Sequence, residues 1–261
     1  MEVAYYVVLA LASIVAYALG LWVGRRGKRA AIVGYVLLLT LLLGKAWLNH
    51  NPATEFALFP WPDYAFFQSY AVFPLALACL GLATGLLQPG PNRRAVVVLA
   101  GFVFLVSLWT ERWVVLDPDT SSKSEAMHDH HCLQTTTYSC GPAASVSVLS
   151  VVGHRSTEGE MMGLCATPAY GGTSMFRIYR GLRLRLPEDY DVRIVDGDPE
   201  ALWERGDPAV ISVRKIHVVA VRFEGDKAVV LDPASPSPQH LDRAAFEERF
   251  GGPAVVVSRR R

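Results

Sequence analysis

The surroundings of Cys140 are those of a nucleophile. Gly-Pro-Ala-Ala and a run of small apolar residues follow it, which predicts a buried helix that begins at the thiol. The partial positive charge at a helix N-terminus lowers the pKa of such a thiol and favours the reactive thiolate. Gln134 lies six residues upstream. Its side-chain amide and the Cys140 backbone N–H can together donate to the oxyanion that forms when a thiolate attacks a carbonyl.

Two downstream residues can complete a nucleophilic site. His217 opens one strand-like run and Asp232 ends the next, with the turn residues Glu224-Gly225-Asp226 between them. Antiparallel pairing across that hairpin can place His217 and Asp232 side by side. We therefore expect Cys140 to attack the scissile carbonyl. His217 would protonate the leaving amine and later activate water, and Asp232 would orient the imidazole.

The elements that must position these residues form two groups. Helices are predicted first and strands afterwards, which indicates an α+β domain with a largely antiparallel sheet. A cleft between the two groups would let a helix-borne thiol meet a strand-borne imidazole. The predicted helices are Cys140–Val152, Ser156–Cys165 and Thr173–Leu182, followed by short ones at Pro199–Arg205 and Arg243–Phe250. The predicted strands are Asp191–Val195, Ala209–Val213, His217–Phe223, Ala228–Leu231 and Ala254–Ser258. Thr157 and Glu160 fit a capping box at the second helix.

The first 115 residues have a different character, because the apolar excess of the chain is concentrated there. Four apolar segments lack a polar stripe, and aromatic residues lie near their ends. A helix needs about 20 apolar residues to cross a bilayer, so we predict four transmembrane helices. The segments are Val3–Val23, Ala30–Leu48, Ala65–Leu87 and Ala95–Trp109. The alternatives are a buried helical core and, for the first segment, a cleaved signal peptide.

Basic residues predict the orientation of these helices. The first connection carries Arg25, Arg26, Lys28 and Arg29, and the third carries Arg93 and Arg94. The second connection, about residues 50–63, has no Lys or Arg. Because positively charged loops stay in the cytoplasm, the remainder of the chain should lie on the extracytoplasmic side. The predicted organisation is a four-helix membrane module at 1–115, a polar linker at 116–127 and a catalytic domain at 128–261.

The second half resembles the family of bacteriocin-processing cysteine peptidases, which cleave double-glycine leader peptides. Four pieces match in order: Gln134…Cys140-Gly-Pro-Ala-Ala, Leu164-Cys165-Ala-Thr167…Gly172-Thr173-Ser174, Ile216-His217-Val-Val and Leu231-Asp232-Pro233-Ala234. The resemblance implies a papain-like fold, a Cys140–His217–Asp232 triad with Gln134 as oxyanion donor, and a peptide or protein substrate. Three departures weaken a link to export. The phosphate loop of a nucleotide-binding domain is missing, and the membrane part precedes the peptidase domain. The predicted extracytoplasmic side is also opposite to the cytoplasmic side on which transporter-linked domains of this family work.

A competing motif lies eight residues before the nucleophile. Asp129-His130-His131-Cys132 spells the signature of protein S-palmitoyltransferases. Those enzymes carry it between their second and third helices in a cysteine-rich zinc domain. This chain has four cysteines, one of them in an apolar segment, so it cannot build such a domain. A metal bound by His128, His130, His131 and Cys132 is the other reading. We favour a solvated polar segment.

The remaining expectations concern partners. The formal net charge of +1 gives no reason to expect a nucleic acid, and we expect no nucleotide, cofactor or metal; the lipid bilayer is the other partner. Cys132 and Cys165 can pair in an oxidising compartment, although two free thiols are favoured. Arg177, Arg180, Arg183 and Arg185 are interpreted as a solvated helix face. A non-catalytic peptide-binding or sensory protein with the same fold is the alternative function.

Overall fold

The computed structural model describes residues 2–68, 71–115, 120–127, 129–168, 172–213 and 217–260. The chain forms two compact units. The first unit comprises Met1–His50 and Phe66–Leu116, and the second comprises Asn51–Ala65 and Asp117–Arg261. The second unit therefore includes a short piece of chain from between the apolar helices.

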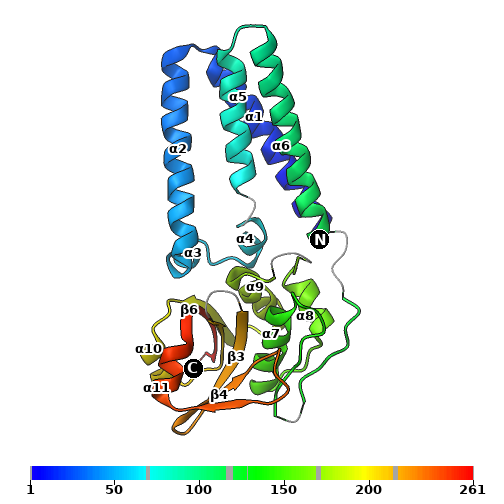
Figure 1. The fold of residues 1–261 in the computed structure, drawn as a ribbon, viewed down its shortest axis with the longest axis vertical. Helices are drawn as coiled ribbons and strands as arrows, with labels where there is room; N and C mark the ends of the chain where they lie inside the picture. The colour runs from blue at the N-terminus through cyan, green and yellow to red at the C-terminus, as the bar shows by residue number, and fades with distance from the viewer. Residues whose placement is uncertain are drawn as a thin grey trace. The chain divides into compact units, whose positions relative to one another are not determined.

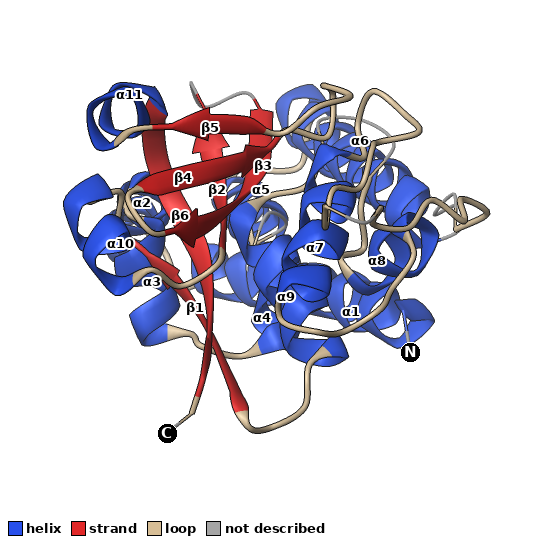
Figure 2. Ribbon diagram, turned by 90° about the horizontal axis from the view of Figure 1, so that it is seen from below, coloured by secondary structure: helices blue, strands red, loops and turns tan. Residues whose placement is uncertain are grey.

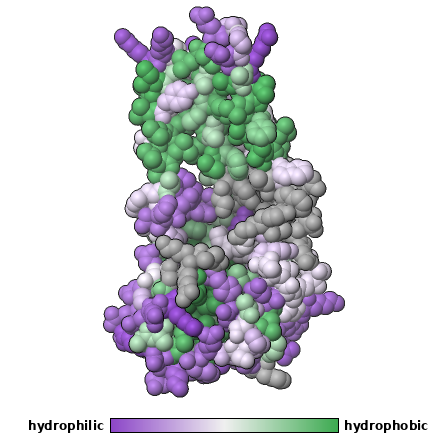
Figure 3. Space-filling view, in the orientation of Figure 1, coloured by the Kyte–Doolittle hydropathy of each residue, from purple (hydrophilic) through white to green (hydrophobic). Residues whose placement is uncertain are grey.

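Long apolar helices make up the first unit (Figure 1). They are α1 (Glu2–Arg25), α2 (Lys28–His50), α5 (Val72–Leu86) and α6 (Pro91–Val115). Three described stretches are long and apolar enough to cross a membrane, namely Val7–Arg25, Lys28–His50 and Pro91–Trp109. Large apolar side chains such as Leu37 and Phe102 are about three-fifths exposed, and the surface of this unit is largely hydrophobic (Figure 3). Such a surface suits lipid better than water.

The third predicted transmembrane segment differs from expectation. Instead of one continuous helix over Ala65–Leu87, the chain forms the short α4 (Pro62–Phe67) and then α5, which has 15 residues. Pro74 explains the start of α5, since it lies in the first turn of this helix. Its ring would clash with the carbonyl four residues earlier, so the helix cannot extend far in the N-terminal direction. A helix of this length is about 22 Å long, shorter than the ~30 Å hydrocarbon core.

Glycines bring α1 and α5 into backbone contact. A Cβ atom at Gly20 would lie 2.2 Å from the Ala78 carbonyl oxygen, and one at Gly81 would lie 2.2 Å from the Tyr17 carbonyl oxygen. Gly24 and Gly85, one turn further along each helix, are equally confined. Two small-x-x-x-small motifs thus face each other, a spacing that membrane helices use for close packing. Both spacings, Gly20 to Gly24 and Gly81 to Gly85, are visible in the sequence.

Replacing Gly81 with leucine should therefore disrupt the first unit. The side chain has no space beside Tyr17, and overpacking of this kind costs about 1–3 kcal/mol or more. We expect the melting temperature of the detergent-solubilised protein to fall by several degrees. Gly44→Leu on α2 is the matched control, because no atom lies within 4 Å of a Cβ placed there. Equal melting temperatures for the two variants would contradict the packing.

The second unit is an α+β domain with one antiparallel sheet. The strand order is β1-β6-β2-β3-β4-β5, and every pairing is antiparallel. The helices α7, α8 and α9 lie on one side of the sheet, and α10 and α11 lie on the other (Figure 2). The helices are α3 (Pro52–Leu58), α7 (Cys140–Val151), α8 (Glu158–Leu164), α9 (Met175–Arg185), α10 (Pro199–Arg205) and α11 (Arg243–Arg249). The strands are β1 (Tyr190–Val195), β2 (Ala209–Val213), β3 (His217–Glu224), β4 (Lys227–Leu231), β5 (Gln239–Leu241) and β6 (Phe250–Arg259).

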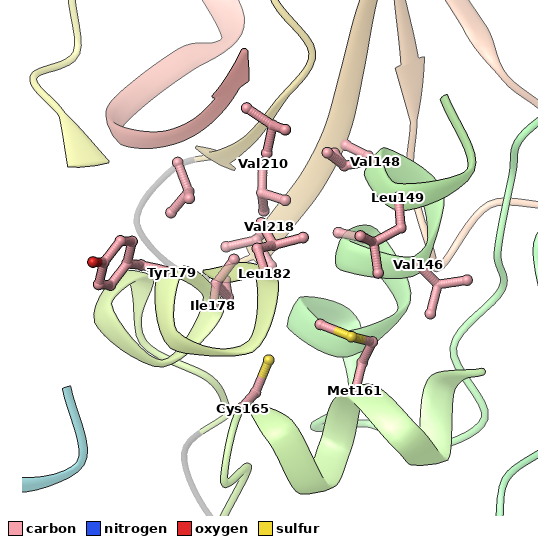
Figure 4. Packing of buried hydrophobic residues seen from close by; sticks show 14 of the residues in the cluster. Val146, Val148, Leu149, Met161, Cys165, Ile178, Tyr179, Leu182, Val210 and Val218 are labelled. Atoms are coloured by element: carbon pink, nitrogen blue, oxygen red, sulfur yellow. The ribbon is translucent and has the colours of Figure 1, made fainter. Parts of the chain in front are cut away.

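Each face of the sheet has its own apolar core. The larger core joins α7, α8 and α9 to alternate strand residues such as Val210 and Val218 (Figure 4). The smaller one joins the opposite strand residues to Phe246 of α11 and Leu202 of α10. This alternation follows from the period of two in a strand. Helix α7, which begins at Cys140, is fixed by the larger core, since Gly141 to Leu149 are all buried.

Residues 51–65 pack into the second unit. Tyr179 of α9 donates from its hydroxyl to the Pro60 carbonyl at 2.7 Å, and its ring meets that of Phe56 with centroids 4.8 Å apart. Tyr64 lies against Phe176 in the same way, and Ala65 is fully buried in the larger core. A connection between apolar helices thus serves as a structural part of the α+β domain.

Part of the predicted linker is also ordered along the domain. The backbone N–H of Glu158 donates to Ser124 at 2.8 Å, and that of Gly159 donates to Ser122 at 3.0 Å. The buried Glu158 carboxylate accepts from the Ser122 hydroxyl at 2.6 Å and from the Thr135 backbone N–H at 2.8 Å. Residues 120–126 therefore run along the start of α8. Residues 116–119 lie outside the described part of the chain.

Candidate active site

Cys140 is the first residue of α7. The sulfur receives hydrogen bonds from the backbone N–H groups of Gly141 and Val218, which places it between the helix and β3. A Cβ atom on Gly141 would come within 2.7 Å of the Thr173 Cβ. Only glycine therefore fits where the helix start meets the chain that leads into α9. The predicted helix start at the thiol is confirmed.

His217 lies between Cys140 and Asp232. Its Nε2 is 2.7 Å from the Asp232 Oδ1, and its side chain is hydrogen-bonded to the Cys140 thiol. Because the carboxylate occupies Nε2, Nδ1 is the ring nitrogen left for the sulfur. Asp232 Oδ1 also accepts from the Ala234 backbone N–H at 2.9 Å. The hairpin brings His217 and Asp232 together as the spacing predicts.

The electrostatics of this row favour an ion pair. Burial raises the pKa of Cys140, but hydrogen bonds from His217 and from backbone N–H groups outweigh it, so the pKa lies below its ordinary value. The pKa of His217 is raised to about 9, first by the hydrogen bond with Cys140 and then, against the effect of burial, by that with Asp232. Both shifts favour a thiolate beside an imidazolium over a neutral thiol beside a neutral imidazole.

Gln134 lies on the segment that passes beside Asp232. Its backbone N–H donates to the Pro233 carbonyl at 3.0 Å. Its side-chain Oε1 is buried and has no hydrogen-bond partner within the described residues. A buried amide left unpaired costs about 1–3 kcal/mol. The Gln134 backbone is therefore held by a hydrogen bond, whereas the side-chain amide oxygen has no partner within the described residues.

His131 is a residue of this site that the sequence did not reveal. The prediction of a solvated segment is wrong here, because His131 is 1% exposed. Its Nε2 lies 2.8 Å from the Asp232 carbonyl oxygen, so this nitrogen carries the proton and donates. The next residue, Cys132, donates from its backbone N–H to Ser147 of α7 at 2.9 Å. Residues 131–134 are thus hydrogen-bonded both to α7 and to the chain that follows β4.

We expect His131→Phe to impair catalysis through Asp232. Phenylalanine fills the space but cannot donate to the Asp232 carbonyl, so the carboxylate would lose its fixed position. We expect kcat to fall by about ten- to a hundredfold, the effect typical of losing a hydrogen-bond partner that orients a functional side chain without touching the substrate. KM should change little, because the buried ring cannot touch substrate. His131→Gln retains a donor and should restore most of kcat. Equal kcat for the phenylalanine variant and the native protein would refute the role.

The other candidates have separate surroundings. His130 Nδ1 contacts the Ser150 hydroxyl at 2.9 Å, and Cys132 Sγ lies 3.6 Å from the Ser124 hydroxyl. His128 lies outside the described residues. In the described ranges, no group of three His, Cys, Asp or Glu side chains is arranged to hold a metal. All four cysteines are free, and Cys165 is buried between α8 and α9 (Figure 4).

The prediction of a solvated arginine face on α9 is wrong for two residues. Arg177 and Arg180 are 3% and 4% exposed. Their guanidinium groups donate to the carbonyls of Ala166 and Leu164 at the C-terminal end of α8. Cations are favourable there because the last carbonyls of a helix lack partners and carry partial negative charge. These arginines hold the end of α8 against α9.

A helix-borne thiol facing a strand-borne imidazole, backed by a carboxylate, defines the class of cysteine peptidases. The comparisons with known proteins agree with this class. Residues 128–261 match the description "Peptidase C39 family". Because the match takes in just over half of the chain, the protein belongs to the peptidase C39 family and is a cysteine peptidase.

Two solved structures are similar to the chain. One is a double glycine motif protease from an AMS/PCAT transporter in complex with the leader peptide, with 19% identity, a TM-score of 0.43, and 54% of this chain and 97% of that chain covered. The other is the peptidase domain of Streptococcus ComA, a bifunctional ABC transporter involved in a quorum sensing pathway. It has 18% identity, a TM-score of 0.41, and 49% of this chain and 96% of that chain covered. No curated protein matches the chain.

Proposed function

We propose that the protein is a membrane-anchored peptidase that cleaves peptide bonds through Cys140, His217 and Asp232. The observation that carries this proposal is the hydrogen-bonded row from the Cys140 thiol through the His217 ring to the Asp232 carboxylate. The lowered pKa of Cys140 favours the nucleophilic thiolate.

The proposed reaction has two stages, acylation and then deacylation of Cys140. The Cys140 thiolate attacks the scissile carbonyl, and the carbonyl oxygen takes the negative charge. Gln134 and the Cys140 backbone N–H donate to that oxygen. The C–N bond then breaks as His217 gives its proton to the departing amine, which leaves a thioester on Cys140. His217, now neutral, takes a proton from water as the water attacks the thioester, and the free acid and the thiolate are released.

The proposed substrate is a peptide cut after two small residues, as in double-glycine leaders. Family membership supports this choice. The test is incubation of purified protein with a leader-type peptide, with the products identified by mass spectrometry. We expect cleavage after Gly-Gly, with the free acid as the new C-terminus, and much slower cleavage when both glycines are replaced by valine. Binding without cleavage would instead favour the non-catalytic peptide-binding alternative.

The packing of residues 51–65 supports a membrane module of four crossings. These residues contribute Tyr64 and Ala65 to the same domain as the catalytic groups, so both stretches lie on one side of the membrane. Between them the chain forms α5 and α6. If α6 crosses the membrane, α5 would cross it as well for the chain to return to the same side, although α5 is one of the shorter apolar helices. The short length of α5 can be accommodated by local thinning of the bilayer or by snorkelling of flanking residues.

The domain is proposed to face the extracytoplasmic side. Basic residues cluster around the connection between α1 and α2 and in the first turn of α6, where Arg93 and Arg94 lie, and residues 51–63 have none. A reporter that is active on only one side of the membrane, fused at Arg261, tests this orientation. We expect activity from a periplasmic or extracellular reporter and none from a cytoplasmic one. The reverse pattern would refute the orientation while leaving the catalytic proposal intact.

A further inference from the structure

A hollow of about 280 Å³ lies beside the His217–Asp232 pair, on the face of the sheet that carries the smaller core. Its floor is apolar and buried, since Ile211, Val219, Val230 and Phe246 are each no more than 6% exposed. Its rim is partly exposed and includes the two candidate catalytic side chains. The remaining rim residues are Val213, Gln239, Leu241 and Arg249.

The walls of this hollow suit an apolar side chain. Its volume is roughly nine times the share of one water molecule in the liquid, which is enough for leucine or phenylalanine. Arg249 donates to the side-chain oxygen of Gln239. The Arg249 guanidinium is therefore paired with the Gln239 amide at the rim. An apolar floor with a few polar groups at the mouth is the usual construction of a ligand subsite.

The position of His217 indicates which part of a substrate reaches the hollow. The ring faces Cys140 through one nitrogen and Asp232 through the other. The leaving amine must receive its proton from the nitrogen beside Cys140. The substrate residue that contains this amine nitrogen therefore extends past the imidazole, on the side of His217 away from the sulfur. The hollow lies on that side, because it touches His217 together with Asp232 and β5 rather than α7.

We propose that this hollow is a subsite for the side chain of the first residue after the scissile bond, and that it selects a large apolar residue there. The inference rests on the proposed catalytic roles of Cys140 and His217. It adds a requirement on the product side of the cleavage site, independent of the two small residues before it. Burial of a leucine side chain in place of alanine should raise kcat/KM by about ten- to a hundredfold.

The test is a series of peptides that differ only in the first residue after the bond, carrying alanine, leucine or phenylalanine. We expect leucine and phenylalanine to be preferred in the native protein. Leu241→Trp fills the hollow from its rim and should reduce the preference to less than about threefold. Leu241→Ala enlarges it and should shift the preference toward phenylalanine. Leu184→Trp, at an exposed position on α9, is the matched control and should leave the preference unchanged.

A second substrate separates this proposal from the catalytic one. A thioester of the leader-side fragment with a small thiol has no residue after the bond, so Leu241→Trp should hydrolyse it at the native rate. If the native protein hydrolyses neither substrate, the catalytic proposal fails. The subsite is then tested by titrating Cys140→Ala with product peptides that begin with leucine or alanine, where equal affinity overturns it. Equal kcat/KM for alanine, leucine and phenylalanine after the bond in the native protein also overturns the subsite.

Discussion

Cys140→Ala should abolish peptide cleavage. Without the sulfur no thioester can form, and His217 has no thiol to deprotonate. The expected loss in kcat is roughly 10⁴- to 10⁶-fold, the range found when the nucleophile or its base is removed from a triad enzyme. The residual cleavage rate would come from substrate binding and the oxyanion donors alone. The measurement is single-turnover cleavage of the leader-type peptide, with products separated by mass.

Cys165→Ala is the control for this variant. Burial raises the pKa of Cys165 to about 12, so this thiol is protonated and unreactive near neutral pH. The variant should retain kcat, although the lost packing between α8 and α9 can lower its stability. A thiol-directed probe should likewise label Cys140 in the native domain and leave Cys165 unlabelled. Cleavage that survives in Cys140→Ala but is lost in Cys165→Ala would contradict the assignment.

Much of the α+β domain is predictable because its signals are local. The helix at Cys140 is marked by small apolar residues, and the structure places Thr157 as the N-cap of α8, with its hydroxyl accepting from the Glu160 N–H at 3.1 Å. The hairpin turn is marked by Gly225, whose φ of 59° favours glycine. The strands on either side of that turn alternate between the two faces of the sheet. Local patterning therefore also predicts that His217 and Asp232, at the ends of these two strands, lie next to each other.

The missed features depend on contacts between distant parts of the chain. His131 meets Asp232 across 101 residues, and Tyr179 meets Pro60 across 119. Local sequence cannot report such pairs, because a polar residue has the same appearance whether its partner is water or a distant carbonyl. The predicted solvated face is wrong for Arg177 and Arg180 for a related reason, although their partners are only 11 and 16 residues away. Their partners, the carbonyls at the end of α8, exist only once the helices have packed.

The pH dependence should report the state of the thiolate–imidazolium pair. On the acid side, activity should fall as the Cys140 thiolate takes up a proton, at a pH below the ordinary pKa of a thiol. On the alkaline side, it should fall as His217 loses the proton that the leaving amine needs, near pH 9. Both limbs belong to the coupled pair rather than to one residue. Because folding raises the pKa of His217, its contribution to stability is complete below about pH 6.5 and is lost as the pH rises through about 9.

His217→Gln separates the contributions to the Cys140 pKa. Without the imidazolium, the effect of burial should dominate and raise the pKa of the thiol, so its alkylation at pH 7 should slow by at least about tenfold. Asp232→Asn is the informative companion. It removes the charge that helps to hold the imidazolium, so the alkaline limb should move to lower pH while the thiol stays in place. Alkylation rates measured from pH 4 to 10 need no substrate, and so they test the pair independently of which peptide the protein cleaves. An unchanged alkylation profile in His217→Gln would show that the sulfur is activated without the imidazole.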